Sequence, residues 1–158
     1  MELKGIETLE MIVNDFVKQF DCVASLSSDF WVDINKNHIY FSLFCTEESN
    51  REFMSTVNKC NPKVSMDIFL WGLLHEIFHV ETYDDLTEEE LDYCYKVKHL
   101  IEENKIDKME YYNLPIERLA TEGAVKYANT HIEELADLWK KLQPAILNFY
   151  RLNDIIDF

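Results

Sequence analysis

Three side chains near the middle of the chain have the types and the spacing to bind a metal ion and to act on water beside it. They are His75, Glu76 and His79, in the pattern H-E-x-x-H. Residues four apart lie on the same face of a helix, so the two imidazoles can bind one divalent cation. Glu76 lies about 100° around the helix from His75, where it reaches a water in the open metal position without binding the metal. The pattern therefore indicates metal-assisted hydrolysis with Glu76 as general base.

The segment around this pattern has the character of a buried helix. From Ile68 to Val80 it has no proline and is apolar on almost every side. Imidazoles and a carboxylate in such surroundings cost free energy unless a partner satisfies them, and a divalent cation is such a partner. The alternative is a pair of hydrogen-bonded core histidines with an incidental glutamate. We favour the metal, because five residues with three fixed identities rarely arise by chance in a chain of this length.

A catalytic zinc ion takes three protein ligands, so a third ligand must come from elsewhere in the chain. The downstream candidates are Glu81, His99, Glu110, Glu117, Glu122 and His131. Glu81 is only two residues after His79 and points to another side of the same helix, while Glu110 lies in an irregular segment. Glu117 lies in the first turn of a later helix, which holds a carboxylate more rigidly than a loop does. We therefore expect Glu117 to be the third ligand; the alternative is a carboxylate stabilised there by the helix dipole.

The composition and charge of the chain limit the classes of molecule that it is expected to bind. The chain has 158 residues, of which 47% are hydrophobic, and this predicts one globular domain over 1–158. Its net charge of −15 repels nucleic-acid backbones and anionic membranes, so we expect neither as a partner. The four cysteines form no C-x-x-C pair, and the sequence contains neither a signal-peptide pattern nor an apolar run long enough to cross a bilayer. We expect a cytoplasmic protein with reduced thiols; nothing in the sequence indicates its oligomeric state.

Hydrophobic periodicity and capping patterns predict the elements that position these residues. Expected helices cover 4–20, 48–59, 68–80, 87–103 and 116–129, followed by a last helix that begins after Thr130. Capping boxes at Thr87–Glu90 and Thr130–Glu133 should open two of them, and Pro144 should kink or split the last one. Residues 104–113 are polar and form the expected mobile loop.

A β-hairpin is expected in the N-terminal half. Residues 30–34 and 38–44 are rich in β-formers, and the link between them holds two asparagines, which tolerate left-handed backbone angles. Residues 22–27 also lean towards strand but are too mixed to assign. The fold class is therefore α+β: a mostly helical domain with a small antiparallel sheet beside the helix that carries H-E-x-x-H.

The segment Pro115–Tyr127, following an H-E-x-x-H, resembles the gluzincin zinc metallopeptidases. It is similar in particular to their small members, the minigluzincins, and to the ImmA/IrrE-like proteins of bacteria and mobile elements. In these families the ligand glutamate opens an E-x-x-A segment with a further alanine four residues on, which matches Glu117, Ala120 and Ala124. Thr121 stands where they carry Asp or Asn as the hydrogen-bond partner of a ligating histidine, and a hydroxyl makes that bond more weakly. The resemblance covers roughly residues 30–127.

The resemblance implies a zincin-like fold, with Zn²⁺ bound by His75, His79 and Glu117 and with Glu76 as the catalytic base. It also implies a peptide or protein substrate, held as an extended strand against the edge of the 30–44 hairpin. A hydrogen-bond donor for the oxyanion would come from Tyr111, Tyr112, Tyr127 or His131, and the sequence does not choose among them. The ligand set would also accept cobalt, nickel or manganese.

Two other functions remain open from the sequence. One is a catalytically silent zinc-binding protein on a peptidase-like scaffold, acting for instance as a phage or mobile-element regulator. The other is an acidic interaction protein without a metal.

Overall fold

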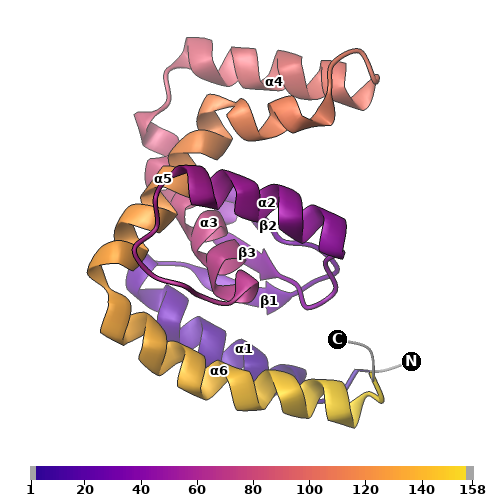
Figure 1. Cartoon of the computed structure of the whole chain (residues 1–158), viewed down its shortest axis with the longest axis vertical. Helices are drawn as coiled ribbons and strands as arrows, with labels where there is room; N and C mark the ends of the chain where they lie inside the picture. The colour runs from indigo at the N-terminus through magenta and orange to yellow at the C-terminus, as the bar shows by residue number, and fades with distance from the viewer. Residues whose placement is uncertain (1–2, 156–158) are drawn as a thin grey trace.

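Helix α3, Ile68–Thr82, passes through the middle of the molecule and is packed on most of its surface (Figure 1). This computed structural model describes residues 3–155 of the chain. Asp67 caps the helix, because its side chain accepts a hydrogen bond from the backbone N–H of Phe69 at 2.9 Å. Ten residues between Phe69 and His79 are buried on α3, which confirms that the helix carrying H-E-x-x-H is a buried one.

A three-stranded sheet lies against α3. Its strands are β1 (Val23–Leu26), β2 (Trp31–Asp33) and β3 (His38–Phe41), in the order β1-β3-β2. Strands β2 and β3 form the expected antiparallel hairpin, and Trp31 pairs with Tyr40. The hairpin is shorter than expected because Ile34–Lys36 forms a 3₁₀ turn, η2, and Asn37 adopts a left-handed conformation.

The sheet is mixed, which corrects the expectation of a purely antiparallel one. Strand β1 pairs with β3 in parallel, on the side of β3 opposite to β2. Residues 22–27 were too mixed in residue type to assign. In the structure Cys22 and Ala24 are buried on either side of the exposed Val23, but residues 25–27 are all partly buried, so the alternation is short. The direction of pairing follows from the path between β1 and β2, and no local pattern encodes that path.

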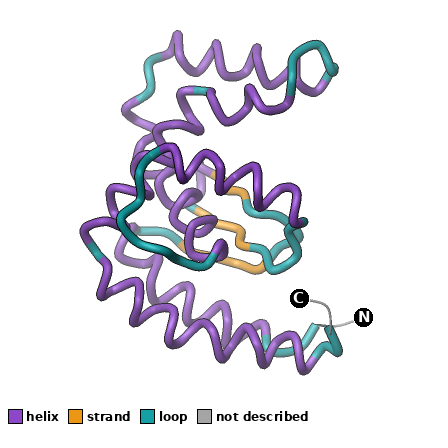
Figure 2. The backbone as a smooth tube through the Cα atoms, in the orientation of Figure 1, coloured by secondary structure: helices purple, strands orange, loops and turns teal. Residues whose placement is uncertain are grey.

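The remaining helices surround α3 and the sheet. They are α1 (Ile6–Val17, extended by η1 at Lys18–Phe20), α2 (Glu47–Lys59), η3 (Tyr83–Asp85), α4 (Glu88–Glu102), η4 (Lys108–Asn113), α5 (Pro115–Thr130) and α6 (Ile132–Leu152). Helices α1 and α6 pack side by side below the sheet in the view of Figure 1, whereas α4 lies at the opposite end. Figure 2 shows how small a share of the backbone is strand. The mostly helical α+β class is confirmed.

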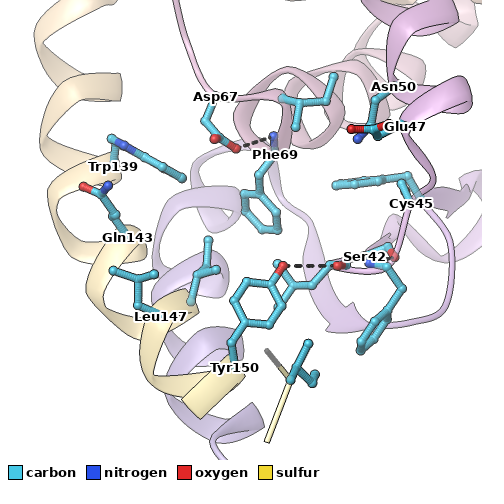
Figure 3. Close-up of a pocket in the computed structure, with 16 residues that line it drawn as sticks. Ser42, Cys45, Glu47, Asn50, Asp67, Phe69, Trp139, Gln143, Leu147 and Tyr150 are labelled. Carbon is cyan, nitrogen blue, oxygen red and sulfur yellow. Dashed lines mark hydrogen bonds between the residues drawn. The ribbon is translucent and has the colours of Figure 1, made fainter. Parts of the chain in front are cut away.

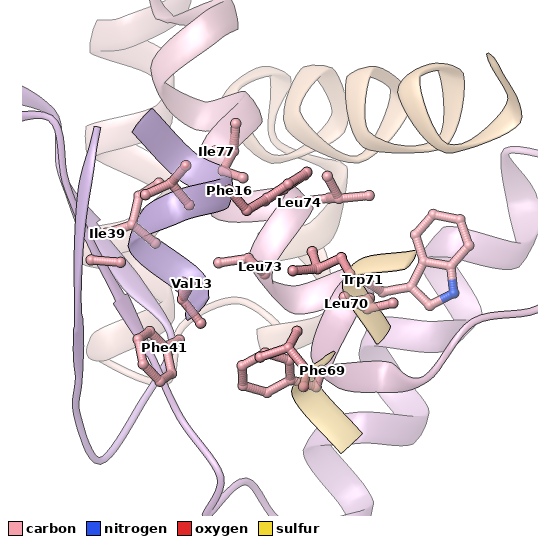
Figure 4. Packing of buried hydrophobic residues seen from close by; sticks show 14 of the residues in the cluster. Val13, Phe16, Ile39, Phe41, Phe69, Leu70, Trp71, Leu73, Leu74 and Ile77 are labelled. Atoms are coloured by element: carbon pink, nitrogen blue, oxygen red, sulfur yellow. The ribbon is translucent and has the colours of Figure 1, made fainter. Parts of the chain in front are cut away.

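The main hydrophobic core lies between α1, the sheet, α3 and α6 (Figure 4). Val13 and Phe16 of α1 and Ile39 of β3 meet Leu73 and Ile77 of α3 there, and all five side chains are buried. A smaller cluster of Cys94, Val97 and Leu114 joins α4 to the start of α5. The first core fixes α3 against the sheet, while the second holds α4 and η4 beside α5. Within residues 3–155, no helix combines the length and the apolar composition needed to cross a membrane.

Three local expectations differ from the structure. Part of the predicted loop at 104–113 is the 3₁₀ helix η4, capped by Asp107 and anchored by the buried Leu114. The second capping box is absent, because the Thr130 hydroxyl turns back to the carbonyls of Lys126 and Tyr127. Helix α6 also continues through Pro144 without splitting. Pro144 and Lys140 are exposed, so water can satisfy the Lys140 carbonyl that the proline leaves without a donor.

Candidate functional site

The candidate site forms where α5 packs against α3. Gly123 allows this close approach, since a Cβ atom at that position would lie 2.6 Å from Cδ1 of Phe78 on α3. The proline at the first position of α5 starts the helix without losing a hydrogen bond, so Glu117 lies in its first turn. The two packed helices bring the first turn of α5 over the His75–His79 face of α3.

His75, His79 and Glu117 converge on one point, although 38 residues separate the second from the third. The Nε2 atoms of His75 and His79 lie 3.1 Å and 3.2 Å from the same oxygen, Oε1 of Glu117. One ligand atom from each residue lies within 4.8 Å of the others. Ligands at about 2.0–2.1 Å from a tetrahedral zinc ion lie about 3.3 Å from one another, so this arrangement fits a divalent cation.

All three side chains are buried: His75 and His79 are each 6% exposed and Glu117 is 3% exposed. Burial by itself raises the pKa of the Glu117 carboxyl. Hydrogen bonds donated by His75 and His79, together with the charges of these residues, outweigh that effect and hold the pKa well below its ordinary value. Glu117 is therefore ionised at neutral pH, as a metal ligand must be.

Thr121 and Phe53 orient the His75 ring. Oγ1 of Thr121, one turn after Glu117 on α5, lies 3.1 Å from Nδ1 of His75. Phe53 of α2 packs with its ring at 86° to the imidazole, with 5.2 Å between the ring centroids. These contacts direct Nε2 of His75 towards Glu117, and a hydroxyl can accept the Nδ1 proton when Nε2 binds a cation.

Glu76 lies beside the three converging side chains but does not join them. It is 7% exposed, and no hydrogen bond to its carboxylate is found within residues 3–155. Burial raises its pKa to about 7; the charge of Glu117 also raises it, whereas those of His75 and Lys98 lower it. A buried carboxyl with this pKa and no fixed partner can both take up and release a proton near neutral pH.

Two cavities open on either side of the site and meet at it. One, of about 270 Å³, reaches His75, and the other, of about 330 Å³, reaches His79. Glu76, Glu117, Phe30 and Tyr111 line both cavities. The site therefore lies in a cleft where the two cavities adjoin. Strand β2, α4 and η4 border the cleft on the His79 side, and α2 and η4 border it on the His75 side.

Tyr111 of η4 occupies this cleft, and the sequence alone did not single it out. Burial raises its pKa above the ordinary value, and the charges of Glu117 and Glu76 raise it further, so the phenol keeps its proton. Nζ of Lys98 on α4 lies 5.5 Å from the centroid of its ring. Tyr112 lines only the cavity on the His75 side. Tyr127 instead hydrogen-bonds to Glu134 and stacks on His131, outside the cleft.

The other candidates for a third ligand lie away from the site. Glu81 is exposed at the end of α3, and His99 pairs with Glu103 on the exposed face of α4. Glu110 accepts a hydrogen bond from Asn113, and Glu122 pairs with Arg118. None of them belongs to the group of ligand atoms found within residues 3–155.

Sequence reasoning missed Phe30 and two helical glycines, and the glycines offered a usable signal. The chain has only three glycines, and Gly72 and Gly123 lie inside the two helices that carry the site. A glycine inside a helix costs about 1 kcal/mol relative to alanine, which suggests a close contact at each position. At Gly72 that contact is Phe30, whose Cζ would lie 2.9 Å from an added Cβ.

Comparison with protein-family models found no match to the chain, and neither curated proteins nor solved structures gave one.

Proposed function

We propose that this protein is a gluzincin-type metallopeptidase that hydrolyses peptide bonds with Zn²⁺ held by His75, His79 and Glu117. The observation that carries the proposal is the convergence of two imidazole nitrogens on one carboxylate oxygen, at 3.1 Å and 3.2 Å, beside a cleft that also contains Glu76. Zinc bound there would lower the pKa of a coordinated water towards about 7 and polarise the carbonyl of the scissile bond.

Glu76 would transfer the protons. No hydrogen bond to its carboxylate is found within residues 3–155, and it lines the cavities on both sides of the site, so it can face a water between the substrate and the metal. It would accept the proton of that water and pass it to the nitrogen of the leaving amine. A nearby divalent cation lowers the pKa of Glu76, which keeps the carboxylate ready to act as a base.

Tyr111 is the best-placed donor for the oxyanion that forms on the substrate carbonyl. Its phenol is partly buried and stays protonated, and its side chain lines both cavities together with Glu76 and Glu117. A donor held in place beside a buried site stabilises developing negative charge without reorganisation.

Strand β2 supports a strand-like mode of substrate binding. It is an edge strand of the sheet, and Trp31 and Val32 line the cavity on the His79 side. An extended peptide could therefore pair with its free main-chain edge and pass across the site. The hairpin was expected to provide such an edge, and β2 is the outer strand of the hairpin in the order β1-β3-β2, which supports this proposal.

The proposal is tested by metal content and proteolysis together. The purified chain should contain about one zinc ion, and it should cleave members of a mixed peptide library in a reaction that a chelator stops and added zinc restores. Glu76→Gln should keep the zinc and lose turnover by about 10³-fold or more. Cleavage retained by Glu76→Gln, or a wild-type chain that binds no metal, would overturn it.

A second function is favoured by one observation, the burial of all three proposed ligands beside a hydroxyl, that of Thr121, where the resembling families carry Asp or Asn. A zinc ion enclosed in this way would suit a regulatory protein that binds a partner and performs no chemistry. Stoichiometric zinc with no chelator-sensitive cleavage of any peptide would support this alternative.

A further inference from the structure

A cavity larger than either cavity at the metal site lies at the N-terminal end of α3 (Figure 3). Its volume is about 770 Å³. Helix α6 forms one wall through Trp139, Gln143 and Leu147, and the segment leading into α2 forms the opposite wall. We call this cavity the distal groove. Nothing in the proposed chemistry uses it.

The distal groove joins the metal site along one face of α3. Ile68, Gly72 and Glu76 are spaced four residues apart and therefore lie on the same side of the helix. Ile68 lines the distal groove, Gly72 lines the cavity on the His75 side, and Glu76 lines both cavities at the site. Cys45 and Asn50 also line both the distal groove and the cavity on the His75 side. The three cavities therefore adjoin one another along α3, and we call them together the channel.

The side chain of Phe30 lines all three cavities of this channel. The ring lies flat against α3 at Gly72 and meets Phe69 edge-on, with 5.9 Å between the centroids. A larger side chain at position 72 would move the ring into the channel. Gly72 therefore keeps open the passage between the distal groove and the metal site.

The walls of the distal groove are mostly apolar, and the charged side chains that line it are all acidic. Phe44 and Leu147 remain 43% and 44% exposed, which leaves apolar surface without a partner. Glu47 and Asp67 are exposed at the rim, and no Lys, Arg or His lines this cavity. Asp67 caps α3. Burial raises the pKa of the Tyr150 hydroxyl, and the negative charge of Asp67 raises it further. The groove thus favours a bulky apolar group with a positive charge beside it.

We propose that the distal groove binds a segment of the peptide substrate that carries a bulky apolar side chain next to a lysine or arginine. The proposal rests on the peptidase function and specifies its substrate. The spacing follows from helix geometry: seven residues separate Ile68 from His75, which at about 1.5 Å per residue amounts to about 10 Å. An extended peptide covers that length in about three residues. The preferred side chain therefore lies three or four residues from the cleaved bond.

The first experiment maps this preference. The zinc-loaded full-length chain digests a peptide library of mixed sequence, and mass spectrometry identifies the cleaved bonds. We expect Leu, Phe or Trp to be enriched three or four residues from the cleaved bond on one side, with Lys or Arg adjacent. Peptides cut short before that position should be cleaved about tenfold less efficiently, measured as kcat/KM.

The second experiment uses matched variants. Leu147→Ser should lower kcat/KM about tenfold on the extended peptide and leave the shortened peptide unaffected. Its control is Leu152→Ser. Leu152 is on the same helix and is 43% exposed but lies outside the distal groove, so this change should leave kcat/KM for both peptides unaltered.

A second pair of variants tests the charge preference. Glu47→Gln with Asp67→Asn should remove the preference for Lys or Arg, and asparagine at position 67 keeps the oxygen that caps α3. Glu133→Gln with Asp92→Asn removes two exposed charges elsewhere and should leave the preference intact.

The outcomes separate the two proposals. Chelator-sensitive cleavage with no preference three or four residues away, or equal effects of Leu147→Ser and Leu152→Ser, would overturn the distal groove as a substrate site and leave the peptidase function standing. An absence of chelator-sensitive cleavage by the wild-type chain would overturn both.

Discussion

Oγ1 of Thr121 lies 3.1 Å from Nδ1 of His75, and this contact determines which ring nitrogen faces Glu117. A hydroxyl can donate to Nδ1 in the metal-free protein and accept from it when Nε2 binds a cation, whereas a carboxylate could only accept. Thr121 therefore occupies the position at which the resemblance to gluzincins predicts a hydrogen-bond partner of a histidine.

Removing this hydroxyl should weaken metal binding. Thr121→Val keeps the shape of the side chain but leaves Nδ1 without a partner, so we expect zinc affinity to fall by about 10–100-fold. Competition with a chromophoric chelator measures the change. Thr121→Ser should retain most of the affinity, and Thr130→Val, which removes an exposed hydroxyl on the same helix, should have no effect. Equal affinities for Thr121→Val and the wild type would show that the contact does not orient the ligand.

Glu76 should make the stability of the metal-free protein depend on pH. Its pKa is raised to about 7 from 4.5 by burial, so the folded state binds more protons than the unfolded state between these values. The stability present below about pH 4.5 is therefore progressively lost as the pH rises to about 7. Glu76→Gln cannot ionise, so above pH 7 it should be more stable than the wild type by about 3 kcal/mol.

Denaturant unfolding in the presence of a chelator, from pH 4.5 to 8.5, measures this difference. The two proteins should converge towards the acid end of the range and diverge as the pH rises. A gap between them that does not vary with pH would mean that Glu76 is not the group responsible.

Gly123→Ala should separate α5 from α3. Alanine normally favours a helix by about 1 kcal/mol over glycine, but here its Cβ would meet Cδ1 of Phe78 at 2.6 Å. We expect a loss of about 1–3 kcal/mol of stability together with weaker zinc binding, because Glu117 moves away from both histidines. Thermal melting with and without zinc measures both effects, and a stabilised variant would contradict the close contact.

Gly72→Ala should instead leave the metal in place and narrow the channel. The added Cβ would lie 2.9 Å from Cζ of Phe30 and push the ring towards the cleft. We expect full zinc occupancy with kcat/KM for extended peptides reduced about tenfold, and partial recovery when Phe30→Leu is added to make room. Loss of zinc from Gly72→Ala would show that the position supports the metal site directly.

The elements of this protein were predictable where the residues that define them are close in sequence. The apolar run from Ile68 to Val80, the capping box at Thr87 and the proline that opens α5 each depend on contacts within one or two turns, and the structure contains all three. The capping box at Thr130 was wrong because the hydroxyl found acceptors one turn back along α5 instead. A four-residue pattern does not show which of several nearby acceptors a hydroxyl will bond to.

The sequence by itself determined the pair of histidines, since residues four apart on a helix must share a face. It also restricted the third ligand to a handful of acids and histidines. Only the tertiary structure brought Glu117 to within 3.1 Å of His75, placed Tyr111 in the cleft, paired β1 with β3 and opened the distal groove. Each of these depends on packing between segments far apart in the chain, and the free energy of that packing is a property of the whole core.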